Sequence, residues 1–208
     1  TLDYSVEVQD AQGRPLRLFT TAQGYWRLPL ELAQLDQRFI AQLLAYEDQR
    51  FYQHSGVDLL ALIRAASQWL WHGRIISGAS TLTMQTVRLI HPAPRTLGNK
   101  LREILLAWQL EQQLEKDQIL RLYLELAPYG GNLQGIRAAS RFYFAKEPTH
   151  LTASESALLI ALPQSPEARR PDRQPQQALV ARNLVLQRLS KRGIIAADLA
   201  RLAQQQPI

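Results

Sequence analysis

Cysteine is absent from this 208-residue sequence, which excludes disulfide bonds and thiolate metal sites. The absence fits either the cytoplasm or an envelope compartment and does not choose between them. Uncharged apolar runs are also far shorter than the roughly 20 residues that a membrane-spanning helix needs. The chain starts at Thr1 with neither Met nor a signal-like segment, and we therefore expect it to be a fragment of a longer chain.

Acidic residues are missing between Leu59 and Arg102. The same stretch contains six cations, Arg64, Arg74, Arg88, Arg95, Lys100 and Arg102. Three carboxylates and a histidine lie within Glu47 to Asp58, just before it, and the next acid is Glu103. This pattern predicts a site where two acids act on a substrate whose negative charge is held by Arg and Lys. The net charge of +6 also favours an anionic partner, whether nucleic acid, a phosphate ester or a membrane surface.

Hydrophobic periodicity predicts a mainly α fold with a short N-terminal β-hairpin. Residues 5–20 alternate between apolar and polar side chains around a central Gln-Gly pair, and we expect this hairpin to be the only sheet. From Pro29 onward the pattern is helical. A buried helix stripe is predicted for Leu101, Ile104, Leu105 and Trp108. No repeat or low-complexity linker interrupts the chain, so we expect a single domain over residues 1–208, with the catalytic region at 30–200.

Two helices near the C-terminus have recognisable ends. Thr152 and Glu155 match a capping box in front of the apolar run Ala157 to Leu162. A second helix is predicted for Asn183 to Arg192, because basic residues occupy its last turn and Gly193 can end it in the left-handed conformation. These local signals do not depend on any assumption about function.

The candidate site residues also have ordinary structural interpretations. Glu47 and Asp48 suit solvated acids at a helix end, and His54 suits a hydrogen-bonded packing residue, because no second His, Asp or Glu stands at metal-ligand spacing from it. Residues 78–85 suit a loop followed by a helix that Ser80 caps. The same geometry would present backbone N–H groups and hydroxyls to an anion, so both interpretations share one structure.

Several short motifs follow one another in a fixed order. They are Glu47-Asp48-x-x-Phe51-x-x-His54-x-Gly56-x-Asp58, Gly78-x-Ser80-Thr81-x-Thr83-x-Gln85, Lys100-x-x-Glu103, Ile119-Leu120-x-x-Tyr123-Leu124, Gly135-Ile136-x-Ala138-Ala139, Leu151-Thr152-x-x-Glu155 and Pro163-Gln164-Ser165-Pro166. The series resembles the peptidoglycan glycosyltransferase domain, glycosyltransferase family 51, of class A penicillin-binding proteins. The resemblance covers roughly residues 5–200.

This resemblance implies a lysozyme-like, mostly helical domain on the periplasmic face of the bacterial inner membrane, anchored by a transmembrane helix that is absent from this fragment. The implied substrate is lipid II, which is polymerised with inversion into β-1,4-linked glycan strands for cell-wall synthesis, with release of undecaprenyl diphosphate. The implied partners are lipid II, the nascent glycan strand and an anionic membrane surface, without nucleic acid. A transpeptidase domain in the same parent chain is implied as well.

The residue roles come from the resemblance, position by position. Glu47 matches the general base, and Glu103 matches the second catalytic acid. Glu103 is implied to assist the leaving diphosphate directly or through a divalent cation, Mg²⁺ or Mn²⁺. No organic cofactor is expected. Asp48 and His54 match residues that support Glu47. The residues that match substrate-binding positions are Phe51, Ser80, Thr81, Thr83, Gln85, Arg88, Lys100 and Arg102.

This assignment agrees with the chemistry that the residue pattern predicts. A sugar hydroxyl must lose its proton as it attacks an anomeric carbon, which needs a positioned carboxylate, and a departing diphosphate needs cations or metal around it. Direct displacement with inversion requires no covalent glycosyl-enzyme, and two carboxylates can serve opposite sides of the reacting centre.

Residues 59–76, which include Trp69 and Trp71, resemble the membrane-associated surface of the family. Tryptophan and cationic side chains suit an interface with anionic lipid headgroups. The alternative is that these apolar residues are simply core.

Four positions depart from the residues that are common in the family: Met84 for Gln, Arg121 for Glu, Glu125 for Asn and Ala145 for Gly. None of them is one of the two catalytic acids. If Glu125 faces inward, it would add negative charge near the donor cleft.

Two other functional classes stay open at this point. A lysozyme-like glycan hydrolase or lytic transglycosylase would share the helical fold and an essential Glu, but its neutral glycosidic leaving group does not need six cations. A non-catalytic module that binds anionic ligands would explain the basic charge, but neither the carboxylates nor the Ser/Thr loop. Release of soluble muropeptides from sacculi would indicate the first class, and steeply salt-dependent DNA binding the second.

Overall fold

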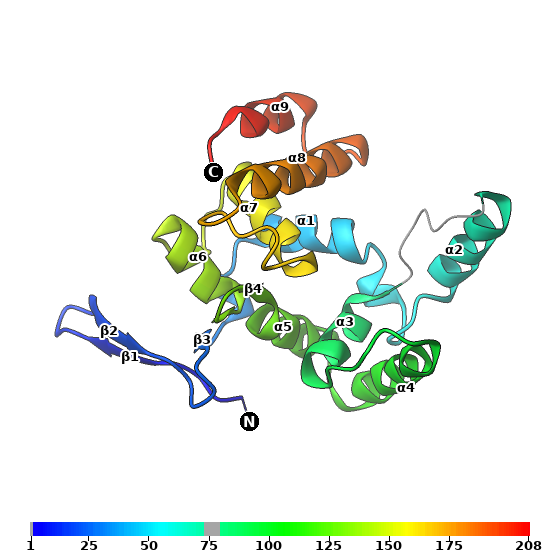
Figure 1. Ribbon diagram of the computed structural model, residues 1–208, viewed down its shortest axis with the longest axis horizontal. Coiled ribbons are helices and arrows are strands. Elements are labelled where there is room, and N and C mark those ends of the chain that lie inside the picture. The colour runs from blue at the N-terminus through cyan, green and yellow to red at the C-terminus, as the bar shows by residue number, and fades with distance from the viewer. Residues whose placement is uncertain (1, 73–79) are drawn as a thin grey trace. The chain divides into compact units, whose positions relative to one another are not determined.

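The computed structural model describes residues 2–72 and 80–208. The chain divides into two compact units, a first unit of Thr1–Tyr46 with Leu124–Ile208 and a second unit of Glu47–Tyr123. Helices α1 (Gln37–Glu47) and α5 (Lys116–Leu126) are the elements along which the chain passes between the units (Figure 1). The single domain expected over the whole chain stays a prediction.

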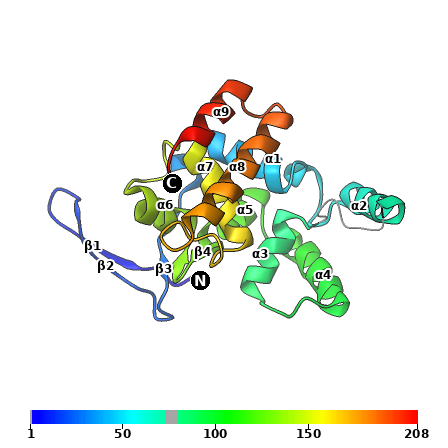
Figure 2. The same ribbon diagram turned by 45° about the horizontal axis from the view of Figure 1, so that its top comes forward.

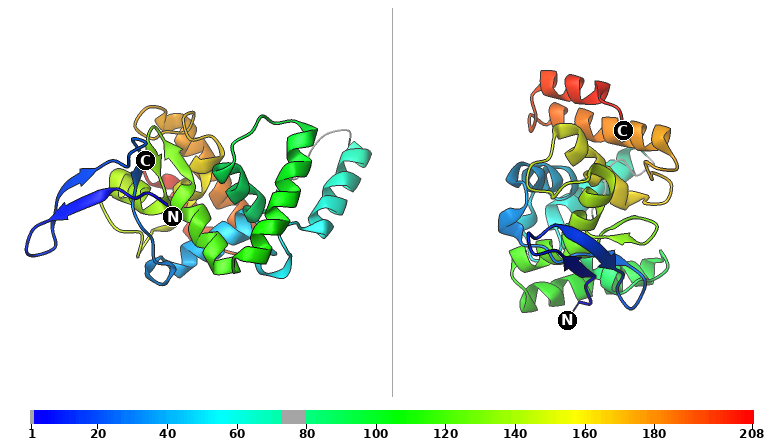
Figure 3. Two further views of the ribbon diagram at one scale, coloured as in Figure 1. Left: turned by 90° about the horizontal axis from the view of Figure 1, so that it is seen from below. Right: turned by 90° about the vertical axis from the view of Figure 1, so that its left-hand side faces the viewer.

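The first unit begins with the predicted β-hairpin. Strands β1 (Val6–Gln9) and β2 (Pro15–Phe19) pair antiparallel. Gly13, at a φ of +77°, makes the turn between them and donates its N–H to the carbonyl of Asp10 at 2.9 Å. In Figure 3 the hairpin extends away from the helices of its own unit. Both the hairpin and its central break are therefore confirmed.

A second sheet contradicts the expectation that the hairpin would be the only one. Strand β5 (Leu133–Gln134) lies between β3 (Trp26–Arg27), with which it is parallel, and β4 (Pro128–Gly130), with which it is antiparallel. Strands of two or three residues are too short to show an alternating pattern, so the sequence does not reveal them. The turn between β4 and β5 is the tight bend that the glycine pair Gly130-Gly131 makes with positive φ.

Helices dominate the remainder of the first unit. They are α6 (Ile136–Phe144), α7 (Ala153–Ala161), α8 (Pro175–Lys191) and α9 (Ala197–Gln205), with short 3₁₀ helices at Leu32–Gln34 and Leu162–Gln164. Helix α7 is almost wholly buried and packs against α8 and α9 (Figures 1 and 2). Its capping box between Thr152 and Glu155 is formed as predicted. Helix α8 starts at Pro175, earlier than predicted, and Gly193 follows it at a φ of +71°.

Helix α8 and Arg192, the residue directly after it, also hold the last turn of α1, which ends at Glu47. The guanidinium of Arg192 donates to the carbonyl of Ala45, and Arg188 donates to the hydroxyl of Tyr46 at 3.1 Å. Carbonyls in the last turn of a helix have no partner within the helix, so the bond from Arg192 stabilises the end of α1, and the bond from Arg188 adds a side-chain contact there.

Two of the family departures are explained within the first unit. Glu125 is 3% exposed, and its carboxylate accepts hydrogen bonds from the Tyr4 hydroxyl and the Leu30 N–H, each at 2.9 Å. Its charge therefore serves contacts of the first unit. Ala145 ends α6 in the left-handed conformation, at a φ of +54°, where glycine would be free of strain.

The second unit contains a short 3₁₀ helix (Phe51–Gln53) and helices α2 (Leu59–His72), α3 (Leu82–Ile90) and α4 (Leu97–Gln113). Helices α3 and α4 pack on one another, as the left view of Figure 3 shows. Met84, Val87 and Ala107 form a small buried cluster at this contact. Met84 is thus a packing residue, which explains why an apolar side chain is tolerated there.

Helix α4 forms as predicted, but most of the apolar stripe that was predicted to be buried is exposed. Leu101, Leu105 and Trp108 are 64%, 63% and 53% exposed, whereas Ile104 packs against the buried cluster. Apolar spacing shows which residues share a face and not what covers that face. Among the side chains of α2 that the structure describes, exposed apolar residues include Leu59, Leu60, Ile63 and Trp71. Within the described part of the chain, no helix has the length and apolarity needed to cross a membrane.

Candidate active site

Glu47 is the final residue of α1 and lies half-buried at the start of the second unit. The side-chain amide of Gln85, in α3, donates to Oε2 of Glu47 at 3.0 Å. This amide is a neutral donor that orients the carboxylate. Helix α3 therefore sets the direction in which Glu47 points.

Asp48 is buried and binds the N-terminal end of α3. Its Oδ2 accepts the N–H of Leu82 at 2.9 Å, and both of its oxygens lie 3.0 Å from Nε2 of His54. A carboxylate is favoured at a helix N-terminus, where N–H groups lack partners within the helix. A carboxylate only accepts hydrogen bonds, so Nε2 of His54 is the donor to Asp48, and Nδ1 is buried without a hydrogen-bond partner among the described residues. Asp48 and His54 thus fix the chain directly after Glu47.

Two hydroxyl residues of the second motif, Thr81 and Thr83, lie beneath the surface. Thr81 caps α3, one residue later than the predicted Ser80, by accepting the Met84 N–H at 3.2 Å, and it donates to the Gly56 carbonyl at 2.6 Å. Thr83 is fully buried. Phe51 is 1% exposed. In this arrangement Thr81, Thr83 and Phe51 support the elements around Glu47 from below, and direct contact of these three with substrate stays a prediction.

Gly56 occupies a position that requires glycine. Its φ is +85°, and a Cβ there would lie 2.7 Å from the carbonyl oxygen of Ala107. The loop after Glu47 therefore runs directly against the backbone of α4. A side chain at this position would push the loop and its neighbour Thr81 away from α4.

Asp58 closes the same loop and was recognised only as part of a motif. Its Oδ1 accepts the N–H of Ala61, which caps α2, and Arg50 donates to both carboxylate oxygens at 2.7 and 3.0 Å. Burial raises the pKa of Asp58, but the Ala61 N–H and the Arg50 guanidinium outweigh it, so the pKa lies below its ordinary value. The role of Arg50 had no signal in the sequence.

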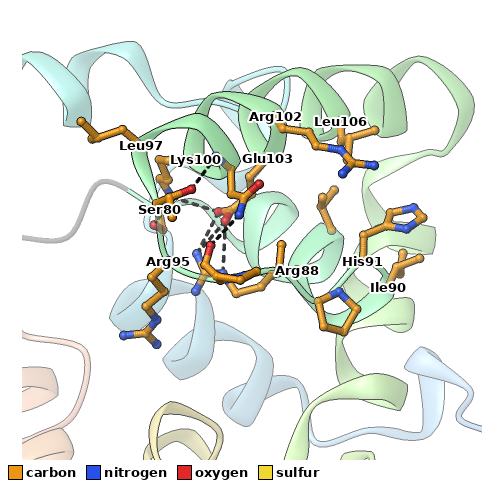
Figure 4. A pocket seen from close by; sticks show the side chains of 16 residues that line it. Ser80, Arg88, Ile90, His91, Arg95, Leu97, Lys100, Arg102, Glu103 and Leu106 are labelled. Atoms are coloured by element: carbon orange, nitrogen blue, oxygen red, sulfur yellow. Dashed lines mark hydrogen bonds and ion pairs between the residues drawn. The ribbon is translucent and has the colours of Figure 1, made fainter.

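A cavity of about 740 Å³ lies within the second unit, between α3, α4 and the loop that joins them. Its walls include five of the predicted residues, Ser80, Arg88, Lys100, Arg102 and Glu103. Figure 4 shows that the side chains of Ser80, Arg88, Lys100 and Glu103 point toward one another. Arg95 and His91 also line the cavity and were not predicted as site residues. Glu47 and Gln85 lie outside its described lining.

Glu103 connects the cations of this cavity. Arg88 donates to Oε1 at 2.8 Å and through Nε to Oε2 at 3.1 Å, and Lys100 donates to Oε1 at 2.9 Å. Nζ of Lys100 also donates to the hydroxyl of Ser80 at 2.7 Å. The carboxylate keeps two cations side by side against their mutual repulsion, and the cluster retains a net positive charge. Such a cluster suits a bound diphosphate, since both cations can donate to phosphate oxygens.

Glu111 and Lys116 were not predicted as site residues either. Glu111 accepts hydrogen bonds from Thr83 and from Lys116. No local sequence pattern distinguishes this pair from ordinary helix-surface charges, since the Thr83 partner is 28 residues away. In the described residues no group of three or more His, Cys, Asp or Glu could hold a metal ion.

Comparison with known proteins gives consistent results. The family described as Transglycosylase matches residues 12–190. The chain is 46% identical over 196 residues to penicillin-binding protein 1C of Escherichia coli (strain K12), which covers 94% of this chain and 26% of that protein. It is 39% identical over 183 residues to penicillin-binding protein 1A of Pseudomonas aeruginosa, covering 88% and 22%. The chain therefore spans about a quarter of the length of these curated relatives.

The fold has a counterpart among solved structures. The crystal structure of penicillin-binding protein 1A from Haemophilus influenzae matches with a TM-score of 0.56 and 22% identity, over 100% of this chain and 21% of that one. This likeness confirms the predicted fold class. Within the family, the Thr-Met-Gln sequence at 83–85 and residues 127–131 and 163–166 predict a resemblance to penicillin-binding protein 1C in particular. The similarity to that protein of Escherichia coli confirms this prediction.

Proposed function

Because the chain belongs to the transglycosylase family, we propose that it is a peptidoglycan glycosyltransferase that polymerises lipid II into β-1,4-linked glycan strands, with inversion and release of undecaprenyl diphosphate. The observation that carries the proposal is the presence, in one compact unit, of a carboxylate oriented by an amide and a cavity lined by cations. The first suits the acceptor hydroxyl and the second suits the donor diphosphate.

Glu47 is the proposed general base. Its oxygen is held by Gln85 at 3.0 Å, so its carboxylate has a defined direction in which to receive the proton of an incoming sugar hydroxyl. As that proton leaves, the hydroxyl oxygen attacks the anomeric carbon of the donor, and the bond from that carbon to the diphosphate oxygen breaks. One displacement inverts the anomeric centre, so no covalent sugar-enzyme bond forms.

Arg88, Lys100 and Ser80 are the proposed contacts of the departing diphosphate, with Glu103 between them. The leaving group gains negative charge as the bond breaks, and preorganised cations stabilise that charge more in the transition state than in the ground state. Glu103 holds Arg88 and Lys100 in place before substrate binds. Arg102 lies on the wall of the same cavity and adds to its positive potential.

We propose that a divalent cation, Mg²⁺ or Mn²⁺, enters the site bound to the diphosphate of the substrate. Glu103 is the one carboxylate in the described lining of the cavity, and Arg88 and Lys100 already donate to it. This donor set does not form a metal site of its own, so an ion would bind with the substrate. Polymerisation measured with EDTA and then with added Mg²⁺ or Mn²⁺ tests the requirement.

We also propose that the exposed apolar faces of α2 and α4 contact an anionic membrane surface. Trp71 is 86% exposed in α2, and Leu97, Leu101 and Leu105 are exposed in α4. No acid accompanies them from residue 59 to residue 102. Exposed aromatic and aliphatic side chains beside cations suit lipid headgroups. A larger fraction of the protein should sediment with vesicles of anionic lipid than with vesicles of neutral lipid, and Trp71→Ala should lower this fraction. Equal sedimentation with both lipids would contradict the proposal.

The setting of the whole protein is proposed from its longer relatives. We expect the native chain to lie on the periplasmic face of the inner membrane, to be anchored by a transmembrane helix and to carry a transpeptidase domain. Labelling of the native protein with a fluorescent penicillin tests for the transpeptidase domain. Absence of labelling at the size of the native chain would contradict it.

The deciding experiment uses purified protein and lipid II in detergent. We expect polymeric glycan that a muramidase digests into disaccharide units. Purified sacculi serve as the second substrate, because a glycan hydrolase or lytic transglycosylase would release soluble muropeptides from them. Polymer from lipid II without muropeptide release supports the proposal, and the opposite result overturns it.

A further inference from the structure

Glu111, in the last turn of α4, is a buried carboxylate with two strong partners. Its side chain is 7% exposed, and its Oε1 accepts from Oγ1 of Thr83 and from Nζ of Lys116, both at 2.6 Å. A carboxylate is costly to bury, and its cost is offset only when the partners hold a good geometry. Loss of Lys116 would leave the charge of Glu111 uncompensated, and loss of the Thr83 hydroxyl would remove one of its hydrogen bonds, so the three groups fix one another's positions.

Lys116, at the start of α5, connects this carboxylate to the loop that follows Glu47. Its Nζ lies 4.5 Å from the centroid of the Phe51 ring, a cation–π contact to a side chain that is 1% exposed. Beside it, the hydroxyl of Tyr52 donates to Oδ1 of Asp117 at 2.9 Å. The first two residues of α5 thus bind two consecutive residues of the loop.

Thr83, the other partner of Glu111, belongs to the first turn of α3. This turn supplies the Leu82 N–H to Asp48, and the next turn supplies the Gln85 amide to Glu47. A shift of the α3 N-terminus would therefore move both donors together. The hydroxyl of Thr83 is the group by which α4 holds this turn in place.

Phe51 follows Glu47 by four residues, so the loop that carries Glu47 and the helix that orients it are both attached to the same ion pair. We propose that Glu111 and Lys116 are positioning residues, which keep Glu47 at hydrogen-bond distance from Gln85 and so set the rate of the chemical step. This inference rests on the proposed function of Glu47 as the base. The pair acts on Glu47 through Thr83 and Phe51 and does not touch substrate.

The kinetic test uses Glu111→Gln and Lys116→Met, with Glu115→Gln as the matched control. Glu115 is exposed and lies four residues after Glu111, so the control makes the same charge change away from Thr83. We expect kcat for lipid II polymerisation to fall about ten- to a hundred-fold in both test variants, with KM within about two-fold, because a small misplacement of a reacting group costs up to that factor. The control keeps the parental values.

Variants of Thr83 distinguish a positioning role of this residue from direct contact with substrate. Thr83→Val removes only the hydroxyl and keeps the shape, so the variant is expected to fold, and Thr83→Ser restores the hydroxyl. We expect Val to lower kcat as Glu111→Gln does, Ser to recover it, and the double variant with Glu111→Gln to be no worse than either single change. A raised KM in Thr83→Val, or losses that multiply in the double variant, would overturn the proposal.

A nuclear magnetic resonance measurement tests the position of the Gln85 side chain independently of catalytic activity. The side-chain amide of Gln85, assigned by its loss in Gln85→Asn, should shift in Glu111→Gln, Lys116→Met and Thr83→Val, and should not shift in Glu115→Gln. An unmoved resonance in the three test variants would overturn the proposal. If the parent makes no polymer, the proposed function fails, and this measurement still decides whether the pair holds Gln85 in place.

Discussion

Glu47→Gln separates the chemical role of Glu47 from its structural role. The substitution keeps the length and shape of the side chain, and the new carbonyl can accept the Gln85 amide that now binds Oε2 at 3.0 Å. Glu47 is half-buried, and the side-chain amide of Gln85 is a neutral partner of its carboxylate. A hydrogen bond to a charged acceptor is worth roughly 1.5–3 kcal/mol and a neutral one about 1 kcal/mol, so the free energy of unfolding should fall by about 1–2 kcal/mol at most.

The rate should fall far more than the stability. An amide cannot take the proton of the acceptor hydroxyl, and loss of a positioned general base costs on the order of a hundred-fold or more. A hundred-fold loss corresponds to about 2.7 kcal/mol in the activation free energy. Initial rates of lipid II polymerisation in detergent give this number, and thermal unfolding gives the stability on the same samples.

Glu115→Gln is the control, since it removes one exposed carboxylate from the same unit. It should match the parent in rate and in unfolding temperature. If Glu47→Gln keeps a rate within a few-fold of the parent, Glu47 is not the base. A rate loss that only follows a collapse of the unfolding transition would show that Glu47 is needed for the fold instead.

Three other predictions follow from the second unit. Arg88→Ala and Lys100→Ala should each lower kcat/KM for lipid II about ten- to a hundred-fold, because a charge-assisted bond to phosphate contributes roughly 1.5–3 kcal/mol; normal kinetics in both would place the diphosphate elsewhere. Gly56→Ala should destabilise the protein by at least about 2 kcal/mol in urea unfolding, since its φ is +85° and its Cβ would lie 2.7 Å from a backbone oxygen; an unchanged midpoint would refute the close approach. Asp58 has a lowered pKa in the folded state, so its stabilisation is present above the ordinary Asp pKa and is lost as the pH falls through the folded value. Asp58→Asn should therefore make stability less dependent on pH below about 4, and an identical acid profile would speak against the Arg50 pair.

The sequence predicts best those features that depend on neighbouring residues. The hairpin turn at Gly13, the capping box of α7 and the glycine after α8 are local, and all three are confirmed. The three-stranded sheet was missed because its strands have two or three residues. The face of α4 was misjudged because burial depends on what packs against a helix, and spacing alone carries no information on that.

The candidate site shows the same limit. Ordered motifs identified most of the residues that the structure brings together around Glu47 and around Glu103. They did not distinguish residues that line the cavity, such as Ser80, from residues that lie below it, such as Thr83. Glu111 was missed because its partners lie in other elements, and a single acid at the end of a helix has no distinguishing pattern.

The distribution of buried side chains explains why polar contacts govern the second unit. Most of the buried apolar residues in the described chain belong to the first unit, and the apolar faces of α2 and α4 in the second unit are exposed. A unit with little apolar core must fix its loops by hydrogen bonds and ion pairs, which depend on distance and direction more steeply than apolar packing does. Asp48, Thr81 and Glu111 supply such bonds around Glu47. Substitutions at these residues should therefore reduce turnover, whereas cavity-forming substitutions in α7 of the first unit should reduce stability first.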